Sequence, residues 1–174
     1  MLTLGNGTVI KVNKGGRIIL SGDNALFNSK NLVFVSSAGT LEIGNNFWAN
    51  RYSAFYCRKR LKFGDDVMVA FNSNIMDTDY HPIFNSQNEI INSDKDVVVG
   101  NKVWIGCNVT VLKGVQIGNH IVVGAGSVVS RNLLEENAIY LGNPAKFVKG
   151  EIDWCMKDPR FTLNTSGLIS ASNN

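Results

Sequence analysis

The stretch VVVGNKVWIGCNVTVLKGVQIGNHIVVGAGSVV, residues 97–129, repeats every six residues. One stripe consists of β-branched residues at every sixth position: Val99, Ile105, Val111, Ile117, Val123 and Val129. A second stripe lies two residues ahead of it: Val97, Val103, Val109, Val115, Ile121 and, closing it, the small Ser127. A period of six fits neither an α-helix nor a long two-residue alternation. It predicts short strands that turn regularly inward and build a solenoid.

A longer period gives the length of one coil. Glycine followed by Asn or Asp recurs at Gly5, Gly22, Gly44, Gly64, Gly100 and Gly118, in steps of 17, 22, 20, 36 and 18 residues. Three faces of six residues account for a coil of about eighteen, so the spacing predicts a three-sided solenoid. The step of 36 contains a surplus of about one coil length. Since polar residues dominate from Asp77 to Lys95, we expect this stretch to leave the wall as a loop, at about 76–96.

The repeat becomes weaker towards both ends of the chain. Apolar residues that continue it less regularly are expected in the first coils: Ile18, Leu20, Leu32, Phe34, Leu41 and Ile43. We therefore expect one β-helix domain over residues 1–150 and a C-terminal extension over 151–174. A short helix or irregular cap is predicted around Glu151 to Lys157, followed by a poorly ordered end rich in Ser, Asn and Thr.

Composition excludes several classes of protein. With 174 residues, 44% of them apolar and 18% charged, the chain can bury one sizeable core. It contains no apolar run of membrane-spanning length and no leader-like N-terminus, and its three cysteines have no metal-like spacing. We expect a cytoplasmic protein without a membrane span. The net charge is +3. Because Lys and Arg do not cluster in one run, nucleic-acid binding is not expected. A mild positive charge suits a phosphorylated or acidic small ligand.

Three motifs, VGNKVWIG (99–106), VGAGS (123–127) and GNPA (142–145), resemble those of the hexapeptide-repeat acyltransferases. The similarity is greatest to the galactoside and maltose O-acetyltransferases and to the capsule and O-antigen O-acetyltransferases. It implies an all-β, left-handed parallel β-helix that forms a homotrimer with active sites between subunits. The handedness comes from the resemblance alone, since parallel crossovers are generally right-handed.

The chain has two histidines, His81 and His120. His120 follows Gly118 and Asn119 in a turn position that other coils fill with Asn46, Asp66 or Lys102, so we expect it to be a solvated turn residue. His81 lies in the loop, where no repeat requires it; from the residues alone it could simply pack there. The resemblance implies that His81 is the general base, which removes the acceptor's hydroxyl proton as the oxygen attacks the thioester of acetyl-CoA.

The resemblance implies further catalytic residues. Asn72 matches an active-site asparagine that could hydrogen-bond the acceptor, although asparagines also stack in β-helix turns. Two carboxylates are candidates to orient the imidazole: Asp79, because it lies two residues before His81, and Glu89, because its loop position resembles that of a family glutamate. Ordinary solvated carboxylates are the alternative for both. A backbone N–H of the wall is expected to stabilise the oxyanion; the sequence does not identify which one.

The coenzyme groove is also inferred from the resemblance. Strand alternation turns Trp104 outward, where it would wall the pantetheine or the acceptor, or be covered by a neighbouring subunit. The other positions that match the groove are Cys107, Ala125, Ser130, Arg131, Lys146 and Lys149. Lys146 and Lys149 stand where arginines are common, so they would contact the coenzyme phosphates without bidentate geometry; ordinary surface lysines are the alternative. Acetyl-CoA is the expected co-substrate, and no metal is expected.

Aromatic and basic residues alternate just before the loop: Trp48, Arg51, Tyr52, Phe55, Tyr56, Arg58, Lys59 and Arg60. Aromatic faces stack on sugars and cations attract carboxylates, so this cluster favours a saccharide acceptor, either an acidic or a nucleotide-linked one. The resemblance implies a saccharide from a capsule, an O-antigen or a nucleotide-linked sugar. Packing in a trimer interface is the alternative.

Other functions stay open at this stage. N-acetylation of an amino sugar or acetylation of an antibiotic would use the same chemistry at His81. A zinc-dependent carbonic anhydrase on a similar β-helix needs three histidines for its metal, and this chain has two. A non-catalytic scaffold or carbohydrate-binding module would have no reason to combine a loop that carries His81 and Pro82 with Trp104 and the GNPA turn.

Overall fold

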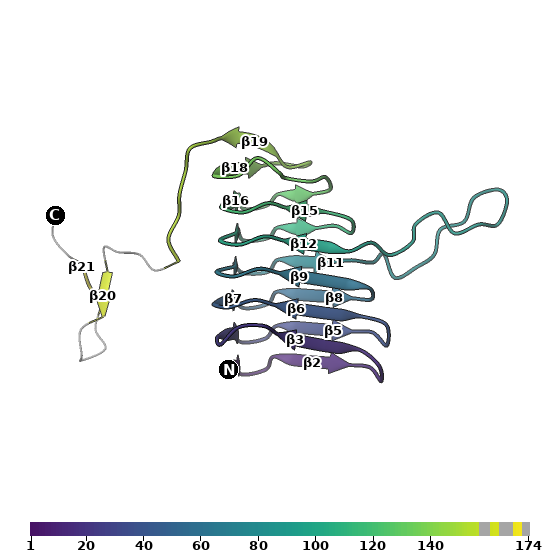
Figure 1. Ribbon diagram of the computed structural model, residues 1–174, viewed down its shortest axis with the longest axis horizontal. Helices are drawn as coiled ribbons and strands as arrows, with labels where there is room; N and C mark the ends of the chain where they lie inside the picture. Colours follow the sequence, from purple (N-terminus) through teal and green to yellow (C-terminus); the bar gives the residue numbers. More distant parts are fainter. Residues whose placement is uncertain (157–160, 164–168, 172–174) are drawn as a thin grey trace.

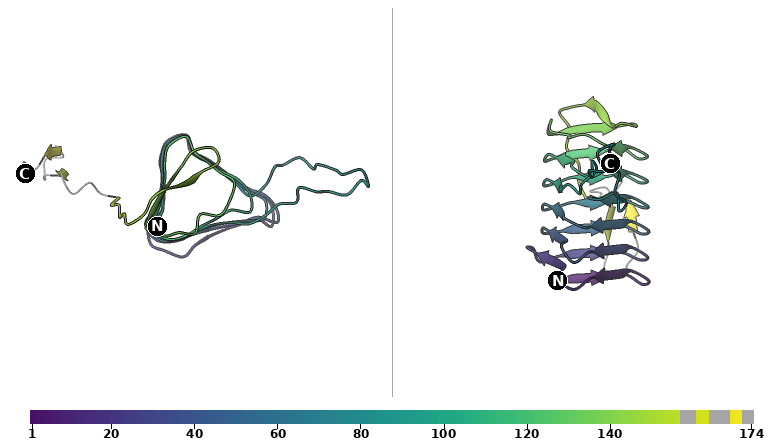
Figure 2. Two further views of the ribbon diagram at one scale, coloured as in Figure 1. Left: turned by 90° about the horizontal axis from the view of Figure 1, so that it is seen from above. Right: turned by 90° about the vertical axis from the view of Figure 1, so that its right-hand side faces the viewer.

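The computed structural model describes residues 1–156, 161–163 and 169–171. The chain winds as a left-handed parallel β-helix of about six turns (Figure 1), and each turn adds one strand to each of three sheets, here called faces A, B and C. Seen along the axis the coils superpose as a triangle (Figure 2). The predicted three-sided solenoid is confirmed.

Each face is a ladder of short strands. Face A contains β1 (Leu2–Leu4), β4 (Ala25–Phe27), β7 (Phe47–Ala49), β10 (Met68–Val69), β13 (Trp104–Ile105), β16 (Ile121–Val123), β18 (Ala138–Leu141) and β19 (Lys146–Lys149). Face B contains β2 (Val9–Val12), β5 (Leu32–Val35), β8 (Ala54–Cys57), β11 (Asn74–Met76), β14 (Thr110–Val111) and β17 (Val128–Val129). Face C contains β3 (Arg17–Leu20), β6 (Thr40–Ile43), β9 (Arg60–Phe63), β12 (Val97–Val99) and β15 (Gln116–Ile117). The turns between faces form three edges, called the AB, BC and CA corners.

Both six-residue stripes point into the helix and are buried throughout residues 97–129. The earlier coils continue the pattern with larger side chains, and Phe27, Phe47, Phe55 and Phe63 form a contiguous aromatic cluster inside the helix. Burial of these apolar columns is the main stabilising contribution to the fold, since each buried side chain of this size contributes about 1.5–3 kcal/mol.

The first coils lie where predicted, but not every apolar residue there faces inward. Val33 and Val35 fill the interior, so Leu32 and Phe34 on the same strand face outward. Leu20 pairs with the buried Ile43 yet stays 38% exposed, because no further coil covers the end of the helix.

The predicted loop leaves the wall at the BC corner, between β11 and β12, and projects far from the helix (Figure 1, right). It is a hairpin: Phe84 and Ile90 form an antiparallel bridge, and the Asn85 N–H donates to the Glu89 carbonyl at 3.0 Å. The outer part of the loop is therefore a hairpin held by its own backbone contacts.

After β18 the chain reverses into β19, which pairs with β18 antiparallel and ends the solenoid. Glu151 to Met156 contain no helix, so the irregular form of the predicted cap is correct for these residues. β20 (Phe161–Leu163) and β21 (Ile169–Ala171) form an antiparallel pair. Lys157, where the predicted cap ends, and most of the Ser-, Asn- and Thr-rich end predicted to be poorly ordered lie outside the described ranges. Within those ranges there is no helix that could cross a membrane.

Candidate functional site

The predicted site residues divide between two corners of the triangle. At the AB corner, or on the strand of face A that leads to it, lie Asn72, Trp104, Cys107 and Ala125. We call these four the AB half-site. At the BC corner, on the loop or just after β17, lie Asp79, His81, Glu89, Ser130 and Arg131. We call these five the BC half-site. Face B separates the two sets, so a single chain does not bring all of them together.

Three side chains fix the backbone around His81. The Asn92 amide donates to the His81 carbonyl and to Asp79 Oδ2, both at 2.9 Å. Lys113, on the neighbouring coil, donates to the same Asp79 oxygen and to the Asn92 carbonyl. Its ammonium, with the amide of Asn92, holds the pKa of Asp79 below its usual range. We call Asp79, Asn92 and Lys113 the loop clamp.

The two predicted orienting carboxylates have other partners. Asp79 belongs to the loop clamp, and Glu89 accepts a hydrogen bond from the Asn85 amide at 2.8 Å. Among the described residues, neither carboxylate accepts a hydrogen bond from the His81 imidazole. The clamp therefore positions the backbone of His81 without using its imidazole.

Buried Asp77 anchors the base of the loop. Its two carboxylate oxygens accept hydrogen bonds from the Arg58 and Lys59 N–H groups, both at 2.8 Å, and its carbonyl accepts one from Lys95 N–H at the other end of the loop. Burial raises the pKa of Asp77 although these N–H donors oppose the shift. The Asp77 side chain thus ties the start of the loop to the preceding coil, and its backbone carbonyl joins the two ends of the loop.

His81 is exposed and lines a cavity of about 370 Å³ beside the loop. Arg58 and Asp94, which form an ion pair at 3.4 Å, lie on its wall. Arg58 also donates to the carbonyl of Tyr80 at 3.1 Å and lies over the Tyr80 ring. The histidine therefore faces a space with both polar and apolar lining that is large enough for a small ligand group.

At the AB corner, Asn72 donates to Asn108 Oδ1 at 2.7 Å. Both residues have positive φ and occupy the same turn position in successive coils. This stacking gives Asn72 a structural role, while its exposed position keeps it accessible to a ligand. Cys107 and Ala125 follow in the next two coils, where the Gly126 N–H donates to the Cys107 carbonyl at 2.8 Å.

Trp104 faces outward, as predicted, and is 37% exposed. Its partner is a residue that the sequence analysis did not single out: Trp154, whose ring lies 6.0 Å away at 42°. Trp154 also donates from its indole N–H to the Lys102 carbonyl at 2.8 Å, and Asp153 forms an ion pair with Lys102 at 2.6 Å. Trp154 lies beyond the last repeat, where no period assigns a position to a side chain.

The remaining predicted coenzyme residues lie near the end of the helix. Lys146 and Lys149 are exposed on β19, directly after the turn that carries the GNPA motif. Arg131 and Ser130 are exposed after β17. His120 occupies a CA-corner turn with positive φ, like Asn46 and Lys102, as predicted. No group of three metal-ligating side chains occurs among the described residues.

The aromatic cluster predicted to contact an acceptor does not lie on one surface. Phe55 is fully buried and packs against Phe27 and Phe63, so its assignment to an acceptor surface was wrong: it occupies an inward strand position. Trp48 is exposed on face A, and Tyr56 packs against Tyr80 at the base of the loop.

Comparison with known proteins connects this geometry to a family. Residues 96–131 match the family model described as bacterial transferase hexapeptide (six repeats). The chain is 46% identical over 99 residues to a polysialic acid O-acetyltransferase of Neisseria meningitidis, which covers 56% of this chain and 46% of that protein. It is 31% identical over 120 residues to the galactoside O-acetyltransferase of Escherichia coli, covering 67% and 57%. The chain thus spans about half the length of these curated relatives.

A solved structure extends the match over more of both chains. The maltose O-acetyltransferase of Clostridium difficile is 30% identical, with a TM-score of 0.55, over 87% of this chain and 71% of that one. The six-residue stripes, the coil architecture and this similarity agree. The chain belongs to the hexapeptide-repeat acyltransferases.

Proposed function

We propose that the protein is an O-acetyltransferase that moves an acetyl group from acetyl-CoA to a hydroxyl of a saccharide. The observation that carries this proposal is the exposed His81, held on a clamped loop beside a cavity. Family membership supports it, and the relatives named above are O-acetyltransferases of saccharides by their names.

The active site is proposed to form between two copies of the chain. Each corner of face B carries one half-site. Between the two corners, the outward-facing side chains of face B are almost all uncharged, and Phe34, Tyr56 and Met76 pair in register on successive strands. Face C, by contrast, presents charged side chains such as Glu42, Arg60 and Lys62. In a homotrimer with face B toward the axis, the AB half-site of one copy meets the BC half-site of the next.

The reaction follows from the chemistry of imidazole. His81 accepts the proton of the acceptor hydroxyl as the oxygen attacks the thioester carbon. The carbonyl oxygen becomes an oxyanion, which a backbone N–H of the wall stabilises. When the tetrahedral intermediate collapses, the carbon–sulfur bond breaks and the imidazolium returns its proton to the departing thiolate of coenzyme A.

The coenzyme is proposed to lie along the same junction. Cys107 and Ala125 would contact the pantetheine arm from one copy, and Ser130 and Arg131 would approach it from the next. Lys146 and Lys149 would attract its phosphates as point charges. Asn72 would hydrogen-bond the acceptor and Trp104 would cover the thioester.

Acetyl-CoA binding and thioester cleavage test this proposal directly. Calorimetry with the purified protein is expected to give a binding isotherm, and a free-thiol assay is expected to detect slow release of coenzyme A. Adding a saccharide acceptor is expected to accelerate that release. Failure to bind acetyl-CoA would contradict the proposal.

The loop clamp gives a separate prediction. Replacing Lys113 by methionine removes the ammonium that holds Asp79 and Asn92, and kcat is expected to fall about tenfold to a hundredfold because small misplacements of a catalytic group are costly. The dissociation constant of acetyl-CoA is expected to stay unchanged, since Lys113 lies outside the coenzyme groove. Rates of acetyl transfer at saturating substrate give kcat, and calorimetry gives the dissociation constant of acetyl-CoA.

Two observations distinguish a role of Lys113 in positioning the loop from a general loss of stability. Lys113→Arg keeps the positive charge and is expected to retain most of the activity. Because the pKa of Asp79 is lowered, its carboxylate is charged at every pH above its ordinary range near 4, so the clamp is lost only on acidification below that range. A Lys113→Met variant whose acetyl-CoA affinity falls in parallel with kcat contradicts a positioning role.

A further inference from the structure

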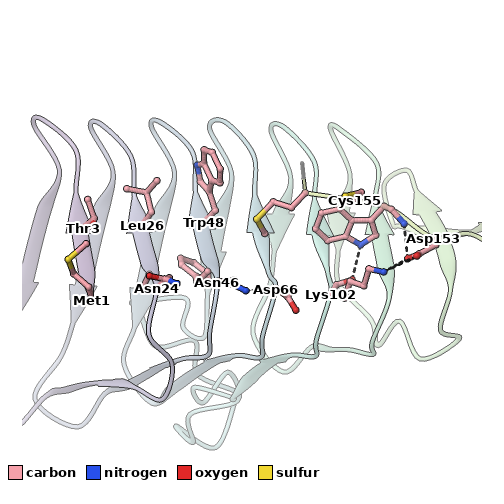
Figure 3. Close-up of a pocket in the computed structure, with 14 residues that line it drawn as sticks. Met1, Thr3, Asn24, Leu26, Asn46, Trp48, Asp66, Lys102, Asp153 and Cys155 are labelled. Carbon is pink, nitrogen blue, oxygen red and sulfur yellow. Dashed lines mark hydrogen bonds and ion pairs between the residues drawn. The ribbon is translucent and has the colours of Figure 1, made fainter. Parts of the chain in front are cut away.

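A groove of about 740 Å³ runs along the CA corner, outside both half-sites. Its floor is formed by outward residues of face A, among them Leu26 and Trp48, and its far wall by the segment Asp153–Met156 (Figure 3). The volume lies within the range of small-ligand sites. None of the catalytic or coenzyme residues proposed above lines it.

The groove has a repeating edge. Asn24, Asn46, Asp66 and Lys102 occupy the same turn position in four successive coils and form one row beside the apolar floor (Figure 3). Neighbouring strands lie about 4.8 Å apart, so the row presents hydrogen-bonding groups at that interval over roughly 14 Å. An elongated ligand with the same repeat can therefore make similar contacts coil after coil.

The floor of the groove is apolar, in contrast to its polar edge. Leu26 pairs in register with Trp48, and Trp48 with Met68, so an apolar ladder lies parallel to the polar row. Trp48 is 36% exposed, and its face is accessible to a ring with C–H groups. Sugar rings in an extended chain present an apolar face and a hydroxyl edge together, which fits this pair of rows.

Trp154 connects the groove to the proposed reaction site. Its ring lines the groove and also packs against Trp104, and its indole N–H is fixed to the Lys102 carbonyl. A chain lying in the groove would therefore reach the indole of Trp104 at its end.

Charge selects among extended saccharides. The Lys102 ammonium is paired with Asp153, and Asp66 accepts a hydrogen bond from the neutral Asn46 amide at 2.9 Å. Among the described residues, the charged groups that line the groove are the carboxylates of Asp66 and Asp153 and the ammonium groups of Lys102 and the Met1 N-terminus. These charges balance, so the groove offers no net positive charge to attract a polyanionic chain, whereas an uncharged chain needs only hydrogen-bonding partners and an apolar floor.

We propose that this groove binds several consecutive residues of an uncharged oligosaccharide, so that the acceptor is a chain and not a single sugar. The inference rests on the proposed function for the identity of the reaction, but the groove itself is tested by binding alone. Trp48 and Trp154 are its specificity-determining residues.

The test measures affinity as a function of chain length. Neutral gluco-, galacto- and manno-oligosaccharides of one to six units, and sialic acid oligomers of the same lengths, are titrated against the full chain by tryptophan fluorescence and calorimetry. At least one neutral series is expected to bind about tenfold more tightly at four units than at one, the equivalent of about 1.4 kcal/mol. Trp48→Ala is expected to remove that gain, while Ile19→Ala, on the outer side of face C, keeps it.

Each outcome has a defined meaning. Affinity independent of length in all neutral series, tighter binding of the sialic acid series, or an unchanged length dependence in Trp48→Ala overturns the inference. Acetyl-CoA binding is measured in parallel: oligosaccharide binding without acetyl-CoA binding supports the groove but contradicts the proposed function. Acetyl-CoA binding together with an oligosaccharide affinity that does not depend on chain length supports the proposed function but contradicts the groove.

Discussion

Replacing His81 by alanine is expected to reduce acetyl transfer about 10² to 10⁴-fold, the usual contribution of a positioned general base. The fold should be unaffected, because His81 is exposed and the loop clamp uses its backbone carbonyl, which alanine retains. The same change is expected to leave acetyl-CoA binding intact. Transfer rates, calorimetry and circular dichroism measure the three effects.

The second histidine provides the matched control. His120 lies in a turn at the CA corner, and its backbone N–H donates to the Asn101 carbonyl, a bond that alanine preserves. His120→Ala is therefore expected to keep nearly full turnover. Near-normal activity in His81→Ala would remove His81 from the proposed mechanism, and a large loss in His120→Ala would contradict the assignment of His120 as a turn residue.

The largest effect on stability is expected at Phe55. Its ring is fully buried among Phe27, Phe47 and Phe63, so Phe55→Ala removes apolar contacts and leaves a cavity. The free energy of unfolding is expected to fall by about 3–5 kcal/mol. Urea denaturation followed by circular dichroism measures it.

The neighbouring Tyr56 supplies the comparison. It lies on the outer side of the same strand and is only partly buried, so Tyr56→Ala is expected to cost less than Phe55→Ala. Equal losses of stability in the two variants, or a Phe55→Ala protein that is stable but impaired only in acceptor binding, would contradict the inward position of Phe55.

The contrast between Phe55 and Tyr56 also explains where the sequence was and was not sufficient. In residues 97–129 two β-branched stripes mark the inward positions, and all of them are buried as predicted. Around Phe55 both faces of the strand carry aromatic residues, so residue type does not distinguish inside from outside. The six-residue register, counted back from Leu61, does so, and the pairing of Phe55 with the inward Val33 and Ile75 agrees with it.

The loop illustrates a second limit. Its position followed from a count of coil lengths between Gly64 and Gly100, but its internal contacts did not. Asp79 lies two residues from His81, which made it a candidate to orient the ring; in the structure its carboxylate binds Lys113, a residue 34 positions away. Contacts between coils depend on the register, which spacing within the loop does not encode.

Trp154 shows the same limit at the C-terminus. The six-residue period ends before Lys149, and beyond it no pattern predicts that the chain returns to face A. The ion pair of Asp153 with Lys102 and the indole hydrogen bond of Trp154 fix that return, and both depend on tertiary contacts.

Complementation between two inactive variants tests the central claim, that the active site combines the AB half-site of one copy with the BC half-site of the next. His81→Ala and Trp104→Ala proteins, each inactive or strongly impaired, are unfolded together, refolded as mixed assemblies, and assayed for coenzyme A release with an acceptor. Random assortment in equal amounts is expected to restore about a quarter of the wild-type sites, because one junction in four then has both halves intact. A mixture no more active than the two variants refolded separately would contradict a site shared between copies.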